Sequence, residues 1–150
     1  MHPKARLKND LKTALKTRDT DRVSAIRMAI AAIQQHEIDS GTREDLPHAK
    51  VIGILERLIK QRLEAATQFR KAGREERARK EEAEARLLES YLPEPIDAEH
   101  LEAEIRSVIH ETGATSSADM GRIMGLLKAR LAGRARMSEV SRRVREILSP

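Results

Sequence analysis

The sequence has no cysteine and only two aromatic side chains, Phe69 and Tyr91. The absence of thiols excludes disulfide bonds, thiolate catalysis and cysteine-bound zinc. With so few aromatic residues, a core has to be built from Leu, Ile, Val, Met and Ala, which suit helix-on-helix packing. No apolar run approaches the roughly 18 residues that span a bilayer, so we expect no transmembrane segment.

The N-terminal residues Met1–Arg6 lead into a charged helix and contain no apolar core of the kind found in a secretory signal peptide. The lack of cysteine also fits a reducing compartment. We therefore expect a soluble cytoplasmic protein that does not act at a membrane.

Charged residues make up 35% of the 150 residues, and Ala, Glu, Lys, Leu and Arg are frequent. This composition, with apolar residues at helical spacing, predicts an all-α protein. Pro93-Glu94-Pro95 interrupts the pattern, because two prolines this close cannot continue a helix. We predict two small helical units joined by this proline-rich boundary: an N-terminal four-helix domain at residues 1–92 and a C-terminal basic three-helix domain at residues 96–150.

The last helix expected in the N-terminal unit opens almost entirely with charged residues. Glu75 and Arg79, and likewise Glu82 and Arg86, are spaced i,i+4 and predict ion pairs along an exposed helix.

The C-terminal unit is predicted to contain a helix with two glycines in its interior. Ser116 and Asp119 have the spacing of a capping box, and the helix is expected to run to about Leu131. Gly121 and Gly125 lie one turn apart on one face, where each costs roughly 1 kcal/mol relative to alanine. This cost suggests that something approaches the backbone there. It is either another helix, the usual meaning of this spacing, or a ligand such as a phosphate backbone.

The positive charge of the chain is concentrated at its C-terminal end. Residues 121–150 carry a net charge of +6, whereas the other 120 residues sum to −1. Basic surfaces attract nucleic acids or anionic membranes, although charged helix faces also simply keep proteins in solution. The candidate phosphate contacts lie on and after the glycine-bearing helix: Arg122, Lys128, Arg130, Arg134 and Arg136.

The sequence shows no catalytic, metal-binding or cofactor-binding pattern. The five histidines form no HExxH pair, and no Gly-x-Ser-x-Gly turn presents a nucleophilic serine. Helix capping explains Ser116 and Ser138, the second of which is expected to cap the last helix. We therefore assign no catalytic residue, and we expect neither a metal nor a cofactor.

Similarity to a known protein family is visible in four stretches: Ser24–Met28, Lys71–Arg74, Glu89–Pro93 and Ala118–Gly125. They resemble the YqeY family over essentially the whole chain. The resemblance implies an all-helical, two-part fold related to the tail of GatB, the B subunit of the tRNA-dependent aspartyl/glutamyl amidotransferase, which helps to hold the tRNA. The turn after the glycine-bearing helix departs from the family, because basic Arg136 stands where an acidic residue is common.

These observations and the resemblance lead to three hypotheses about function. The leading one is binding of tRNA or another structured RNA by the C-terminal unit, with Gly121 and Gly125 allowing close approach. The alternative is a protein–protein adaptor whose glycine-bearing helix seats a protein partner. The least favoured is a stand-alone carbon–nitrogen ligase with glutamine as amido-N-donor, since the catalytic domains of the amidotransferase have no room in 150 residues.

Overall fold

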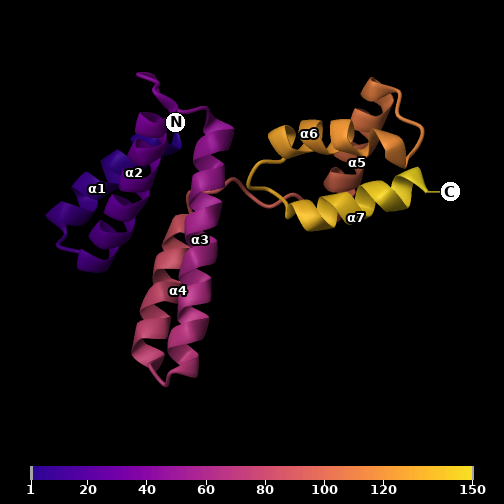
Figure 1. Ribbon diagram of the computed structural model, residues 1–150. Coiled ribbons are helices and arrows are strands. Elements are labelled where there is room, and N and C mark those ends of the chain that lie inside the picture. The colour runs from indigo at the N-terminus through magenta and orange to yellow at the C-terminus, as the bar shows by residue number, and fades with distance from the viewer. Residues whose placement is uncertain (1, 150) are drawn as a thin grey trace. The chain divides into compact units, whose positions relative to one another are not determined.

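Helices make up most of the computed structural model, which describes residues 2–149 (Figure 1). These residues contain no strand, which confirms the predicted all-α fold. In chain order the elements are α1 (Pro3–Lys16), α2 (Thr20–Ser40), α3 (His48–Lys71), α4 (Glu75–Glu89), α5 (Ala98–Thr112), the 3₁₀ turn η1 (Ser117–Asp119), α6 (Met120–Arg130) and α7 (Met137–Leu148). The chain divides into two compact units between Leu92 and Pro93. That each unit folds as an independent domain stays a prediction.

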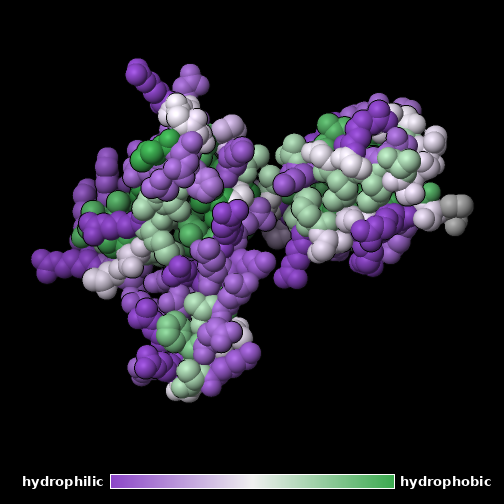
Figure 2. Space-filling view, in the orientation of Figure 1, coloured by the Kyte–Doolittle hydropathy of each residue, from purple (hydrophilic) through white to green (hydrophobic). Residues whose placement is uncertain are grey.

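In the N-terminal unit, α1 lies beside α2, and α3 forms an antiparallel hairpin with α4 (Figure 1). The core takes fully buried aliphatic side chains from all four helices, among them Leu7, Ile33, Leu55 and Leu88. Burying each of them contributes about 1.5–3 kcal/mol, and this burial holds the helices together. Hydrophilic residues cover most of the visible face of the α3–α4 hairpin (Figure 2).

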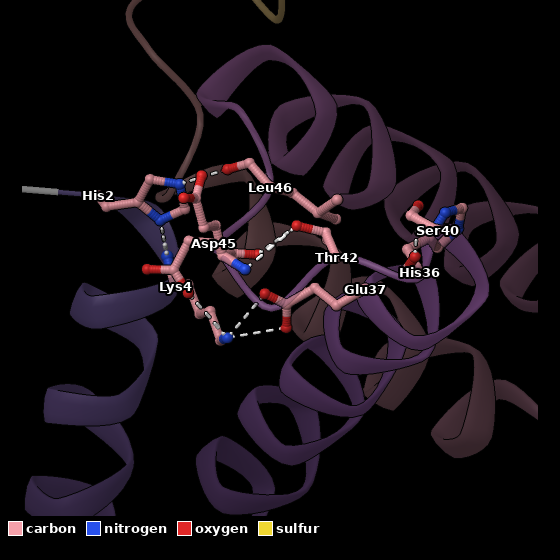
Figure 3. Close-up of polar contacts among 9 residues, drawn as sticks. His2, Lys4, His36, Glu37, Ser40, Thr42, Asp45 and Leu46 are labelled. Atoms are coloured by element: carbon pink, nitrogen blue, oxygen red, sulfur yellow. Dashed lines mark hydrogen bonds and ion pairs between the residues drawn. The ribbon is translucent and has the colours of Figure 1, made fainter.

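The start of α1 is fastened to the loop between α2 and α3 (Figure 3). His2 Nδ1 accepts a hydrogen bond from the backbone N–H of Lys4, while Nε2 lies 2.9 Å from the carbonyl oxygen of Leu46. Both contacts are satisfied by the neutral tautomer with its proton on Nε2. Lys4 Nζ lies 2.8 Å from Glu37 and 3.1 Å from Asp45, and the hydrogen bond to Glu37 is the main cause that raises the pKa of Lys4.

The end of the N-terminal unit is fastened to α1 through Tyr91. The Tyr91 hydroxyl donates a hydrogen bond to the Asp10 carboxylate, and the Arg6 guanidinium lies 4.5 Å from the centre of the tyrosine ring. Arg6 also donates to the carbonyl oxygen of Ser90 at 2.9 Å. Burial, followed by the hydrogen bond to Asp10, raises the pKa of Tyr91 to about 12.

This raised pKa predicts a loss of stability at alkaline pH. The folded state favours the neutral phenol, so the contribution is intact below pH 10 and disappears as the pH rises to about 12. We expect a decrease of about 2 kcal/mol in the free energy of unfolding, measured by urea titration at a series of pH values. Tyr91→Phe should lack this decrease. The same pH dependence in both proteins would mean that the hydroxyl is as well solvated in the folded state as in the unfolded one.

Ion pairs connect the two helices of the α3–α4 hairpin. Glu75 pairs with Arg79 at 3.5 Å, as predicted, and also with Arg70 of α3 at 3.0 Å. The prediction that Glu82 pairs with Arg86 is wrong, because Glu82 reaches across the hairpin to Arg70. One arginine of α3 therefore holds two carboxylates of α4.

A second arginine of α3 lies against two carboxylates that are almost fully buried. Glu81 and Glu84 expose only 4% and 8% of their surface. Arg62 lies 3.4 Å from Glu81 and 3.9 Å from Glu84, and the exposed Arg77 approaches Glu81 at 3.6 Å. Burial and the neighbouring Glu81 raise the pKa of Glu84, while the charge of Arg62 opposes this shift. The hairpin thus contains a buried polar layer in which Arg62 is the cation that lies near both carboxylates.

In the C-terminal unit, α5, α6 and α7 contact one another around a separate core. Its fully buried side chains include Ile105, Ile123, Leu127 and Val144. The segment after the prolines joins this unit, because the backbone N–H of Ile96 donates to the carbonyl oxygen of Arg134 at 2.9 Å.

The cap predicted at Ser116 is confirmed, but it belongs to the 3₁₀ turn η1, and Asp119 does not return a bond to Ser116 as a capping box would. The Ser116 hydroxyl accepts a hydrogen bond from the N–H of Ala118, and the Asp119 carboxylate accepts one from Thr115. These bonds close the 3₁₀ turn η1, so that α6 begins only at Met120.

The predicted cap at Ser138 is wrong. Helix α7 begins at Met137, and Ser138 lies inside its first turn. The capping position is held by Arg136, whose side chain makes no capping hydrogen bond. Met137 packs against the core of the C-terminal unit, and burial of its side chain outweighs a cap worth about 1 kcal/mol.

Candidate nucleic-acid interface

The two glycines of α6 lie on its solvent-facing side. Ile123 and Leu127 point into the core, whereas Gly121 and Gly125 are exposed. A Cβ atom added at either glycine would meet no atom of the described chain within 4 Å. The close packing of another helix, which the spacing suggested, is therefore not present within the C-terminal unit.

The sequence analysis missed a third small residue on this face. Ala129 is exposed and follows Gly125 by four residues, which extends the small face by one turn. Leu126 lies beside it and exposes 39% of its surface, which is unusual for a large apolar side chain in this protein. The spacing from Gly121 to Ala129 was the available signal. We define the open face of α6 as Gly121, Gly125 and Ala129.

Arg122 flanks the open face and is held at the end of α5. Its Nη2 donates to the carbonyl oxygen of Thr112 at 2.9 Å and lies 3.6 Å from Asp119. The side chain still exposes 58% of its surface, so part of the guanidinium faces solvent.

Arg130 lies near two carboxylates of α5. Its guanidinium forms an ion pair with Glu111, and Nη1 lies 3.9 Å from Glu104. The hydrogen bond to Glu111 raises the pKa of Arg130, and the same bond lowers the pKa of Glu111. The charge of Arg130 is therefore largely balanced inside the protein.

Arg134 and Arg136 lie in the turn between α6 and α7 and differ in their contacts. The Nε of Arg134 donates to the carbonyl oxygen of Glu94 at 3.2 Å, which ties the proline segment to this turn. The exposed side chain of Arg136 has no hydrogen bond or ion pair with the described residues.

Lys128 is the second of the five predicted cations that has no partner among the described residues. It is exposed and follows Gly125 by three residues, so it borders the open face. The five predicted cations therefore divide into three that already bond within the protein and two, Lys128 and Arg136, that do not.

This arrangement suits contact with a phosphate backbone better than contact with bases. A helix without side chains on one face lets a polyanion approach, and the flanking cations can neutralise it. The C-terminal unit has no Phe, Tyr or Trp on which a base could stack, since Phe69 and Tyr91 both precede it.

Two further kinds of site were sought in the described part of the chain. Residues 2–149 contain no group of three His, Cys, Asp or Glu side chains placed to hold a metal ion. No helix within the same range combines the length and the apolar character needed to cross a membrane.

Comparison with known proteins identifies a family and several relatives. The family model described as "Yqey-like protein" matches residues 4–148. Proteins named "Altered inheritance of mitochondria protein 41, mitochondrial" are similar: the one from Eremothecium gossypii is 35% identical over 116 residues, covering 76% of this chain and 63% of the relative. The Kluyveromyces lactis protein is 37% identical over 87 residues, with 58% and 46% covered. The protein from Meyerozyma guilliermondii is 34% identical over 86 residues, with 57% and 44% covered. The chain thus spans roughly half the length of these relatives.

The cytoplasmic location expected from the sequence is contradicted by these names. Each of these relatives is named as a mitochondrial protein, and these names do not support a general cytoplasmic location. The expectation came from the absence of an apolar signal core. Mitochondrial targeting segments are amphipathic and rich in arginine and serine, so a search for an apolar core does not detect them.

Proposed function

The chain belongs to the Yqey-like protein family, and from this premise we propose that its C-terminal unit binds tRNA or another structured RNA. The observation that carries the proposal is the open face of α6, where Gly121 and Gly125 leave the backbone uncovered beside the unpaired Lys128. The resemblance to the tRNA-holding tail of the amidotransferase B subunit supports the same role.

The energetic argument concerns the two glycines. Gly125 lies in the interior of α6 and costs roughly 1 kcal/mol relative to alanine, Gly121 lies in its first turn and costs less, and no contact within the unit offsets either cost. A partner that approaches the backbone closely would explain why glycine stands at both positions. Gly53 in α3 is also open, but it stands alone, and the exposed residues one turn later are Glu56 and Arg57.

The cations supply the attraction to the phosphate backbone. Lys128 and Arg136 are free to contact phosphates directly. Arg122 and Arg134 each retain donors, because a guanidinium has five N–H groups and each of these uses only one or two. The contacts of these arginines to Thr112 and Glu94 also limit the rotamers that have to be ordered on binding. We therefore expect recognition by shape and backbone, without base readout.

Replacing Gly121 and Gly125 by alanine tests this proposal, because the double substitution should change stability and tRNA affinity in opposite directions. The double variant should be more stable by about 1–2 kcal/mol, since a Cβ at either site meets only solvent. Its affinity for bulk tRNA should nevertheless fall, because the added methyl groups obstruct the backbone approach. Thermal unfolding and fluorescence anisotropy with labelled tRNA measure the two effects.

Gly53→Ala is the matched control for this experiment. It also fills open space on a helix, so it should raise stability and leave tRNA affinity unchanged. If the Gly121 and Gly125 variant gains stability and binds tRNA as well as the wild-type protein, the open face is not an RNA contact.

A protein–protein adaptor is the second candidate, favoured by Ala129 and the exposed Leu126 on the same side of α6. Small residues at successive turns let a partner helix approach, and a neighbouring leucine adds apolar contact. Gly125→Leu should then abolish capture of the protein partner in a pull-down and leave tRNA binding unchanged. Loss of tRNA binding with retained folding would instead favour the RNA proposal.

A further inference from the structure

A second concentration of positive charge lies in the N-terminal unit. Residues 1–18 contain six Lys or Arg and a single acidic residue, Asp10, whereas residues 19–120 carry a net negative charge. The Asp10 carboxylate accepts a hydrogen bond from the Tyr91 hydroxyl and offsets only one of these positive charges. Hydrophilic side chains project from the part of the unit where α1 and α2 lie (Figure 2).

Three lysines form a stripe along the solvent-facing side of α1. Lys8, Lys12 and Lys16 are exposed and follow one another at intervals of four residues, whereas Leu7 and Ala14 on the opposite side are buried. This spacing places successive lysines about 6 Å apart along the helix. None of the three forms a hydrogen bond or an ion pair with the described residues.

The neighbouring acidic groups do not neutralise the positive charge of the three lysines. The charge of Lys8 lowers the pKa of Asp45 only to a minor degree, because the main cause is the hydrogen bond from Lys4. Lys12 and Lys16, nearer the end of the helix, have no such neighbour among the described ion pairs.

An arginine in a strained conformation follows the stripe. Arg18 has a φ of +57°, and it is the only residue other than glycine with a positive φ among those described. Its N–H donates to the carbonyl oxygen of Leu15, and the next N–H donates to that of Ala14, as in a helix end that usually has glycine at this place. The strain is an independent sign that this position serves something other than stability.

We propose that α1 is a second RNA-binding surface, on which Lys8, Lys12, Lys16 and Arg18 contact a phosphodiester backbone. The inference rests on the proposed function, because it names a further surface for the same partner. An RNA fits better than an anionic membrane. A membrane-bound helix inserts its apolar face into the bilayer, whereas Leu7, Leu11 and Ala14 of α1 are packed into the core of the unit.

The triple variant Lys8→Gln, Lys12→Gln, Lys16→Gln tests the stripe in the full-length protein. Each phosphate contact that is lost removes close to one unit from the slope of log affinity against log salt. We expect the slope for bulk tRNA to flatten by roughly two to three. The control is Lys50→Gln, Lys60→Gln, Lys71→Gln on α3, which removes the same charge from exposed sites in the same unit and should change the slope far less.

Two variants of Arg18 separate its charge from its backbone strain. Arg18→Gly should raise the midpoint of thermal unfolding by about 2–4 °C and flatten the salt slope by about one. Arg18→Gln keeps the strained backbone, so it should flatten the slope equally without the gain in stability.

The outcomes distinguish this inference from the proposed function. If wild-type protein binds tRNA and the triple variant has the wild-type slope, or matches the α3 control, the inference is wrong and the proposed function stands. If wild-type protein does not bind tRNA, both are wrong. Binding of the wild-type protein and the triple variant to vesicles that contain phosphatidylserine is measured as a further comparison. If the triple variant loses vesicle binding but keeps its tRNA slope, α1 is a membrane contact and the inference is overturned.

Discussion

Arg62→Ala is expected to lower the free energy of unfolding by about 3 kcal/mol or more, measured by urea denaturation at neutral pH. The physical reason is that Glu81 and Glu84 would remain buried with their nearest cation removed. Water cannot compensate them fully, and an unpaired buried charge is far more costly than a broken surface pair. The loss should shrink as the pH is lowered from neutral, because burial and the neighbouring Glu81 raise the pKa of Glu84 and its protonation removes one charge.

Two further variants define what the Arg62 result means. Arg79→Ala removes an ion pair on the exposed side of α4 and should leave stability nearly unchanged. Adding Glu84→Gln to Arg62→Ala should restore part of the loss, because the amide needs no counter-charge. If Arg62→Ala is as stable as the wild-type protein, the two carboxylates are hydrated and the polar layer does not hold the hairpin.

Lys128→Gln combined with Arg136→Gln is expected to weaken tRNA binding by about 100-fold at 0.1 M salt. Both cations lack a partner in the described chain, so each is free to release a counterion from the RNA on binding. Removing two such contacts should flatten the plot of log affinity against log salt by about two. The difference between variant and wild-type protein should therefore fade as the salt concentration approaches about 1 M. Fluorescence anisotropy across a salt series measures both quantities.

Arg106→Gln combined with Arg142→Gln is the control for this variant. It removes the same charge from the same unit, but these arginines already pair with Glu102 and Glu146 at i,i+4. The slope of log affinity for tRNA against log salt should change little. An equal loss in both double variants would show that only the net charge matters and that α6 and its turn form no specific surface.

Much of the fold could be predicted because local signals and tertiary packing agree in this chain. Asp19 and Asp97 are of a residue type that favours helix starts, and they cap α2 and α5, while Gly41 and Gly113 end the same helices in the left-handed conformation. Membership of the YqeY family was also predicted correctly from short stretches of sequence. Ser138 shows where this reasoning fails, because the packing of Met137 moved the helix start away from the best local cap.

The buried layer of the hairpin could not be predicted from the sequence. Ala78, Ala85 and Leu88 mark the buried side of α4, and their spacing places Glu81 on it, but charged residues are so frequent in this helix that the sequence alone does not show the burial of two carboxylates. Their burial depends on where α3 places Arg62, and this is set by the tertiary packing of the two helices. The pairing of Glu82 with Arg70 in place of Arg86 has the same origin.

The candidate site was predicted as a set of cations, but the sequence could not show which of them are free. Arg130 is held by Glu111, and Arg134 by a backbone carbonyl from the proline segment, and both contacts join residues far apart in the chain. What meets the two glycines could not be decided from the sequence, for a related reason. A pair of glycines one turn apart usually marks packed helices, and only the structure shows that no helix of this unit covers them.

The most direct measurement is the equilibrium affinity of the full-length protein for bulk tRNA between about 50 and 200 mM salt. Binding through the C-terminal unit predicts that log affinity falls linearly with log salt, with a slope of about −2 or steeper from Lys128 and Arg136 alone. Undetectable binding at the lowest salt concentration, or an affinity that does not depend on salt, would contradict RNA binding by this protein.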